Sequence, residues 1–277
     1  MSKAEDLTED PSSRPDTEKA PETASRKAFG EDQAVGLRAL FEAMDPALFC
    51  VACALPAPAT VAFGMALAHE LRGRGRQSLL VDEIPLRDRG PGLVYPVAVR
   101  YDLGQALAGD VPLWRAVRLV APGFWFAAAG RDAEAGLRPG GRNRGATLLE
   151  RLRGSDFELD VVIVLTDRPR AQSLLRHGSP WQRLLVLGAD DESLRLAPTH
   201  LAALSQLGGT GAVSVLVAGG DDEAQAVAAF EHLRSLAASR LALALRWIGW
   251  VSMSDPGGLS LPSALAELFD EPLGGQA

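Results

Sequence analysis

Hydrophobic residues follow two alternating patterns along most of the chain. Short continuous apolar runs are typical of strands buried on both faces of a sheet, and they occupy 47–54, 77–85, 124–130, 160–167, 183–189, 212–218 and 243–251. Between these runs, apolar residues recur at spacings of three and four, which predicts helices over 60–72, 102–109, 146–153, 198–207 and 222–239. The same spacing predicts a helix over 31–44, ahead of the first strand.

Strands that alternate with helices indicate an open sheet covered by helices on both faces. We therefore expect an α/β fold, a three-layer α/β/α arrangement with a mostly parallel central sheet, formed by residues 46–277. Residues 1–29 are rich in Ser, Pro, Thr and charged residues and poor in large apolar ones. Such a segment cannot bury enough surface to offset its ordering entropy, so a disordered tail is expected there. Residues 30–45 form a separate N-terminal helix in this scheme.

The charge and composition of the chain argue against several classes of function. The net charge of -7 and the pI of about 5.2 do not favour nucleic-acid binding. No apolar run is long enough to span a membrane, and the N-terminus is not a signal peptide, so a cytoplasmic protein is expected. The segment 261–277 contains acidic residues and no Lys or Arg, so membrane association is not expected there either.

The two cysteines, Cys50 and Cys53, lie three residues apart on a predicted strand and so point to opposite faces. No second cysteine pair completes a metal site. We expect two core residues and no bound metal.

The segment LFCVACALPAPATVAFGMALAHELRGRGRQSLLVDEIP, residues 48–85, carries a family resemblance. Together with the order of the later segments, it resembles the MinD/ParA family of deviant-Walker P-loop ATPases, which implies the P-loop NTPase fold. In the family pattern, Ala54 stands where the signature lysine would be, and Ala59 where the lysine that contacts the β- and γ-phosphates would be. Thr60 matches the magnesium-binding hydroxyl, and Asp82 is retained.

Other positions that the resemblance marks as functional also differ here. Ile84 stands where the water-orienting aspartate is expected, and Ala218 stands where an asparagine is expected. Leu165 stands where the switch aspartate is expected, although Asp167 follows two residues later. All three lysines of the chain precede residue 28, so none in residues 46–277 replaces the missing ones. The expectation is a pseudo-ATPase with no catalytic residues and no cofactor, whose vestigial nucleotide site is Ala54, Ala59, Thr60 and Asp82. Weak ATP and magnesium binding stays open, because the helix that begins at Thr60 offers some anion affinity.

The segment DQAVGLR, residues 32–38, indicates a branch of the family. Taken alone, it is an ordinary helix start with an acidic first turn. In front of a MinD-like domain it resembles the N-terminal element of FlhG/FleN regulators of flagellar number. The residues that carry this likeness are Asp32, Gln33, Ala34, Gly36, Leu37 and Arg38. The resemblance implies that they bind and stimulate FlhF, a GTPase of the signal-recognition-particle type.

The sequence thus predicts a non-catalytic regulator of bacterial flagellar biogenesis that acts through partner binding. Besides the GTPase, a flagellar transcription activator or a basal-body protein is a candidate partner. Two alternatives stay open. One is an ATP-dependent FlhG/FleN-type switch with a remodelled site, and the other is a different MinD/ParA-like pseudoenzyme, in cellulose synthesis or cell division.

Overall fold

The computed structural model describes residues 46–84, 100–130, 144–169, 181–207, 211–253 and 261–270. The predicted tail, 1–29, and the predicted partner-binding helix, 30–45, lie outside the described residues. Everything below concerns the unit that begins at Asp45.

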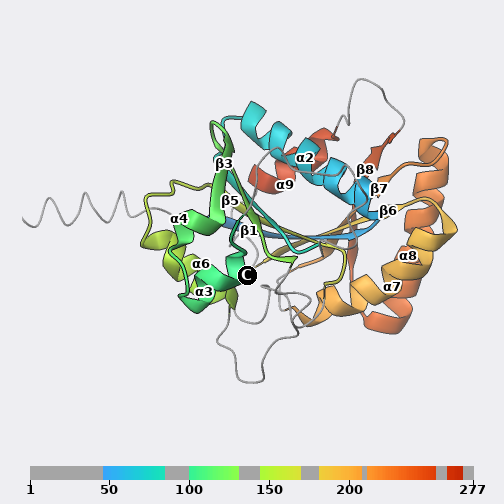
Figure 1. The fold of residues 1–277 in the computed structure, drawn as a ribbon. Coiled ribbons are helices and arrows are strands. Elements are labelled where there is room, and N and C mark those ends of the chain that lie inside the picture. Colours follow the sequence, from blue (N-terminus) through green and yellow to red (C-terminus); the bar gives the residue numbers. More distant parts are fainter. Residues whose placement is uncertain are drawn as a thin grey trace, which may run out of the picture. The chain divides into compact units, whose positions relative to one another are not determined.

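An eight-stranded sheet forms the centre of this unit, and seven of its strands match predicted runs (Figure 1). The order across the sheet is β3-β4-β2-β5-β1-β6-β7-β8. The strands are β1 (Ala47–Ala54), β2 (Ser78–Asp82), β3 (Val117–Ala121), β4 (Phe124–Ala128), β5 (Val161–Thr166), β6 (Gln182–Gly188), β7 (Val213–Ala218) and β8 (Leu245–Val251). All neighbouring strands are parallel except β3 and β4.

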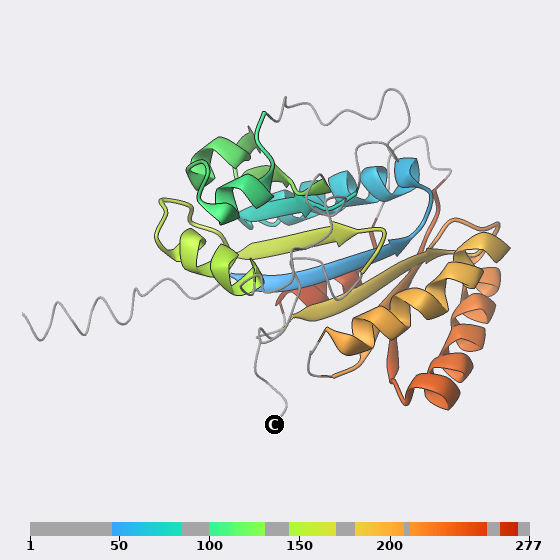
Figure 2. The same ribbon diagram turned by 60° about the horizontal axis from the view of Figure 1, so that its bottom comes forward.

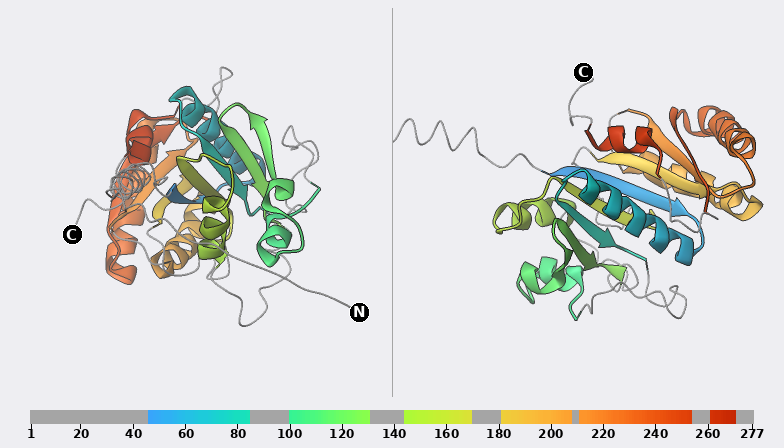
Figure 3. Two further views of the ribbon diagram at one scale, coloured as in Figure 1. Left: turned by 90° about the vertical axis from the view of Figure 1, so that its left-hand side faces the viewer. Right: turned by 90° about the horizontal axis from the view of Figure 1, so that it is seen from above.

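Helices cover both faces of the sheet, which confirms the predicted three-layer α/β fold (Figures 1 and 2). One face packs against residues of α3 (Leu103–Ala108), α4 (Leu113–Ala116), α6 (Arg144–Arg153), α7 (Asp191–Gln206) and α8 (Glu223–Leu241). The other face packs against α2 (Ala57–Gly73) and α9 (Ser263–Asp270). Figure 3 shows α2 and α9 lying side by side over their face of the sheet.

Two predicted helix boundaries were wrong, each for a local reason. Helix α2 begins at Ala57 rather than Thr60, because proline is well suited to the first turn of a helix and Pro58 lies there. Helix α7 begins at Asp191 rather than Pro198, because the Asp190 carboxylate caps it by accepting a hydrogen bond from the Ser193 N–H. Pro198 therefore lies inside α7.

Strand β3 is the third correction, because no strand was predicted over 117–121. It lies at an edge of the sheet and runs antiparallel to β4 through a two-residue turn that contains Gly123, at φ +76°. Only its first residue, Val117, is buried, so the segment lacks the continuous apolar run that marks the other strands.

The two cysteines lie on opposite faces of β1, as predicted. Cys50 belongs to the apolar cluster under α7 and α8, and Cys53 belongs to the cluster under α2 and α9. Both thiols are buried and free. Burial raises the pKa of both thiols, so at neutral pH each is a protonated core group rather than a reactive thiolate.

The end of the described chain packs into the core. On α9, Leu265, Leu268 and Phe269 are buried, and the Phe269 ring lies 4.1 Å from that of Phe49 between ring centroids. Among the described residues, no helix combines the length and the apolar character that a membrane crossing needs.

Candidate functional site

The carboxyl ends of the central strands meet at one edge of the sheet, next to the start of α2. The strand register places Asp82 of β2 beside Leu165 of β5, and Ala54 of β1 beside Leu187 of β6. In open α/β sheets, ligands bind outside the carboxyl ends of the strands, where the connections diverge to opposite sides. Here the connection from β1 to β2 moves toward the β3 end of the sheet, and the connection from β5 to β6 moves toward the β8 end. The carboxyl ends of these strands are therefore the candidate site.

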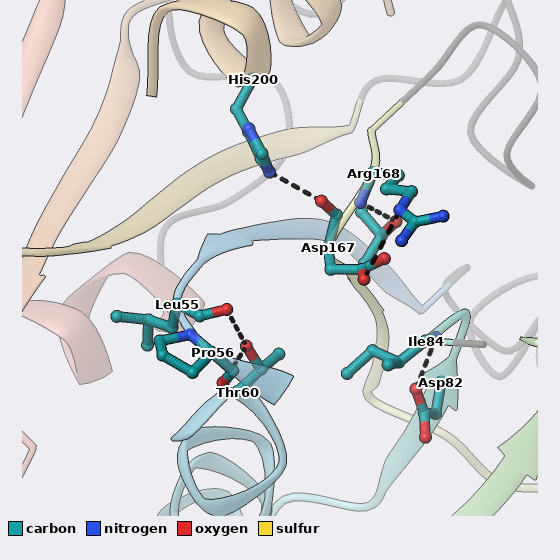
Figure 4. A network of polar contacts seen from close by, with 9 residues as sticks. Leu55, Pro56, Thr60, Asp82, Ile84, Asp167, Arg168 and His200 are labelled. Atoms are coloured by element: carbon teal, nitrogen blue, oxygen red, sulfur yellow. Dashed lines mark hydrogen bonds and ion pairs between the residues drawn. The ribbon is translucent and has the colours of Figure 1, made fainter. Parts of the chain in front are cut away.

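The junction between β1 and α2 consists of only two residues, Leu55 and Pro56. The Thr60 backbone N–H donates a hydrogen bond to the Pro56 carbonyl oxygen at 3.0 Å, as part of the helix. The Thr60 hydroxyl donates to the carbonyl oxygens of Leu55 and Pro56, each at 3.3 Å (Figure 4). Thr60 is fully buried, and both its polar groups serve the helix start.

This junction offers few donors to an anion. The N-cap residue and the first three residues of a helix have N–H groups with no partner inside the helix. Two of these four residues are Pro56 and Pro58, which have no N–H. Ala57 and Ala59 supply the only remaining donors of the first turn, whereas a phosphate loop surrounds its ligand with consecutive N–H groups.

Asp82 lies at the end of β2 and is fully buried. Its Oδ1 accepts a hydrogen bond from the Ile84 backbone N–H at 2.8 Å (Figure 4). The carboxylate therefore holds the turn that follows β2. The Ile84 side chain is itself fully buried.

Buried apolar residues occupy three positions that the family resemblance marks as functional. Ile84, Leu165 and Ala218 are at most 3% exposed and belong to one apolar cluster, which also includes residues of α2 and α9. Leu165 packs tightly against α2, since a Cβ atom added to Gly64 would lie 2.7 Å from its Cδ2 atom. Side-chain packing thus fills the space beneath the start of α2.

Two carboxylates act on the buried Cys53 thiol at this edge. The pKa of the Cys53 thiol is raised by burial first, and then by the charges of Asp167 and Asp82, while a hydrogen bond from Thr60 acts in the opposite direction. These two carboxylates disfavour a further negative charge near Cys53. Arg168 pairs with Asp167 at 3.8 Å, but its side chain is 45% exposed, so solvent screens this pair.

A contact that the sequence did not indicate joins α7 to this edge. His200 is buried, and its Nε2 atom lies 2.8 Å from the carbonyl oxygen of Asp167, which follows β5 (Figure 4). The Nδ1 atom lies 3.1 Å from the Leu196 carbonyl oxygen on the preceding helical turn. A single histidine on a helix carries no spacing signal, so only the fold could reveal this contact.

The structure brings together Ala54, Thr60 and Asp82 of the predicted vestigial site, with Ala59 in the first turn of α2. Ala54 is buried, and its methyl group cannot supply the positive charge of a lysine at that position. The predicted partner-binding residues, 32–38, lie outside the described residues. In the described part of the chain, no group of three or more His, Cys, Asp or Glu residues could hold a metal ion.

Several known structures have a similar fold. A putative plasmid partition protein from Borrelia burgdorferi B31, bound to AMPPNP, superimposes with a TM-score of 0.55 and 11% identity, covering 82% of this chain and 98% of its own. Apo McdA from Cyanthece has a TM-score of 0.53 and 16% identity, with 81% and 90% coverage. This chain has the MinD/ParA-type P-loop NTPase fold.

MinD in the MinC:MinD cell division complex of Aquifex aeolicus is similar at the same level. Its TM-score is 0.50 at 17% identity, covering 81% of this chain and 85% of the matched chain. Neither a protein-family model nor a curated protein sequence matches the chain. At these identities the MinD/ParA-type likeness establishes the fold, and function has to be argued from the site.

Proposed function

We propose that this protein is a non-catalytic MinD-like regulator of bacterial flagellar biogenesis, which acts in the cytoplasm by binding partners. Its MinD/ParA-type domain serves as a scaffold that neither hydrolyses nor depends on ATP. The N-terminal segment that includes residues 32–38 stimulates an FlhF-type GTPase. The observation that carries the non-catalytic part is the junction at Leu55 and Pro56, where α2 begins directly after β1.

Phosphate binding at a P-loop requires an array of N–H donors and a positive charge. The first turn of α2 has two available N–H groups, and the Thr60 N–H and hydroxyl both donate to carbonyl oxygens instead. The Thr60 hydroxyl keeps its oxygen lone pairs while it donates, so the misfit lies in the two prolines of the junction and in the missing lysine. The residues present therefore do not fit a magnesium–nucleotide complex, and we assign no catalytic step to them.

The packing around this edge supports the same proposal. Phosphoryl transfer depends on positioned charges that stabilise the transferring phosphoryl group. Buried apolar side chains, Ile84 and Leu165, occupy the positions of two aspartates. No lysine lies in residues 46–277 to offset the charge of a triphosphate.

The partner part of the proposal rests on the resemblance of residues 32–38 to the FlhG/FleN element. An exposed glutamine delivered beside bound GTP can orient the attacking water, as glutamine does in other GTPases. The predicted apolar stripe, Leu37, Leu40, Phe41 and Met44, gives that helix a face with which to dock in a groove. A flagellar transcription activator or a basal-body protein is a further candidate partner.

Adding the full-length protein to the cognate FlhF-type GTPase tests the partner proposal. We expect faster GTP hydrolysis, measured by phosphate release, and loss of most of that stimulation in the Gln33→Ala variant. Gln206→Ala is the matched control, because Gln206 is exposed at the end of α7, and it should stimulate as the unaltered protein does. Absence of stimulation, or equal stimulation by Gln33→Ala, would contradict the proposal and favour a pseudoenzyme with a different partner.

The ATP-dependent switch is the other candidate, because Thr60 and Asp82 are retained. If the protein is such a switch, its stimulation of GTP hydrolysis by the FlhF-type GTPase should change when ATP and magnesium are added. Our proposal expects the same stimulation with and without them.

A further inference from the structure

Strand β3 forms one edge of the sheet and carries an exposed apolar surface. Among the described strands it pairs only with β4. Leu119, in the middle of β3, is 57% exposed, and Trp114, on the short helix α4 that leads into the strand, is 60% exposed. These are the two most exposed large apolar side chains in the described part of the chain.

The apolar surface continues from β3 to its neighbours. Leu119 lies opposite Trp125 of β4, on the same face of the sheet. The Trp125 ring meets the Phe157 ring edge-on, with 6.3 Å between the centroids, and both side chains are half-buried. Leu119, Trp125 and Phe157 therefore form one apolar strip that begins at the open edge of the sheet, which we call the β3 strip.

Arginines lie on β3 and on the segment that leads into it, whereas the exposed acidic residues Asp156 and Glu158 lie on either side of Phe157. Residues 100–121 contain three arginines and two aspartates, and one aspartate, Asp102, is buried as the N-cap of α3. Arg115 lies over the Trp114 ring at 5.1 Å from its centroid, and Arg100 lies over Tyr101 at 5.4 Å. Arg118, on β3, has a buried Nε atom without a hydrogen-bond partner. In the part of the chain that the structure describes, none of the three arginines forms an ion pair.

Arg118 and Leu119 are neighbours on a strand and lie on opposite faces of the sheet. A strand added outside β3 would place its own residues alternately beside each of them. Burial beside Leu119 favours an apolar residue, and Arg118 favours a carboxylate. We propose that the outer edge of β3 binds an extended segment of a partner protein in which apolar and acidic residues alternate, adding it to the sheet as a further strand.

The same charges disfavour a second copy of this chain as the occupant. Antiparallel pairing of two β3 strands would bring the Arg118 residues of the two copies to the same edge. Like charges placed close together across an interface oppose association. The partner is therefore acidic, and the site is independent of the N-terminal segment that the proposed function uses.

A fluorescently labelled peptide with alternating valine and glutamate tests this site by anisotropy on the full-length protein. The control peptide has lysine in place of glutamate. We expect the glutamate peptide to bind at least about tenfold more tightly than the lysine peptide at low salt, because Arg118 lies on β3 and Arg115 on the helix that leads into it. Leu119→Ser should weaken binding by about tenfold through the loss of apolar burial. Val227→Ser, at a position 40% exposed on α8, is the matched control and should bind as the unaltered protein does.

Charge reversal gives a second test that does not rely on loss of binding. Arg118→Glu should now bind the lysine peptide more tightly than the glutamate peptide, which also shows that the variant is folded. Equal binding of both peptides, no binding of either by the unaltered protein, or an equal effect of Val227→Ser would overturn the proposal. A dimer in sedimentation that Leu119→Ser abolishes would overturn it too, because the occupant would then be a second copy.

Discussion

Replacing Leu165 with aspartate is expected to unfold the protein or to lower its free energy of unfolding by several kcal/mol. Leu165 is fully buried on β5 and packs against Gly64 of α2. Truncation to alanine at such a site removes about 2–5 kcal/mol through lost burial and a residual cavity. Aspartate removes the same contacts and in addition buries a carboxylate among apolar groups, so its effect should exceed that of alanine. Urea unfolding followed by tryptophan fluorescence at neutral pH measures both.

This comparison is informative because the family resemblance places an aspartate at that position. Leu165→Met is the matched control, since it conserves volume and should change the free energy of unfolding by less than about 1.5 kcal/mol. If Leu165→Asp unfolds at the same urea concentration as Leu165→Met, the position still has room and solvent for a carboxylate. The site would then be a vacant nucleotide site rather than part of the core.

Replacing Gly249 with alanine is expected to lower the free energy of unfolding by about 2–4 kcal/mol. Gly249 has φ +141°, a conformation that residues with a Cβ atom rarely adopt, and such strain is worth about 1–3 kcal/mol. A Cβ atom there would also lie 2.9 Å from Cγ of Pro262, just before α9. Overpacking adds a further penalty on the order of 1 kcal/mol or more.

The matched control for this substitution is Gly73→Ala at the end of α2. A Cβ atom at Gly73 would meet nothing within 4 Å, and this glycine has no positive φ, so the control should leave the urea midpoint nearly unchanged. Equal midpoints for the two variants would mean that β8 and Pro262 are not packed as described.

Most of the parallel strands were predictable because burial on both faces leaves a pattern in their own sequence. A strand buried on both faces requires a continuous apolar run, so β1, β5 and β7 stand out in the sequence. Strand β3 was not predictable in the same way, because it lies at the edge and only Val117 is buried. The helix starts at Ala57 and Asp191 lie ahead of the predicted ones and depend on Pro58 in the first turn of α2 and on the Asp190 cap of α7.

The family pattern predicts residues for the candidate site but not their geometry. Ala54, Ala59, Thr60 and Asp82 follow from the family pattern. That pattern cannot show that the Thr60 hydroxyl donates to the Leu55 carbonyl, because this depends on where α2 begins. The contact between His200 and Asp167 depends on the packing of α7, which residue spacing does not encode.

The central claim is that the former nucleotide site no longer takes ATP, and calorimetric titration of the full-length protein with ATP and magnesium tests it most directly. The account predicts no saturable heat at ATP concentrations up to about 1 mM, which corresponds to a binding free energy weaker than roughly -4 kcal/mol, and no ATP turnover. Saturable binding or turnover that Thr60→Ala abolishes would contradict it, because the Thr60 hydroxyl would then contact magnesium instead of the Leu55 and Pro56 carbonyls.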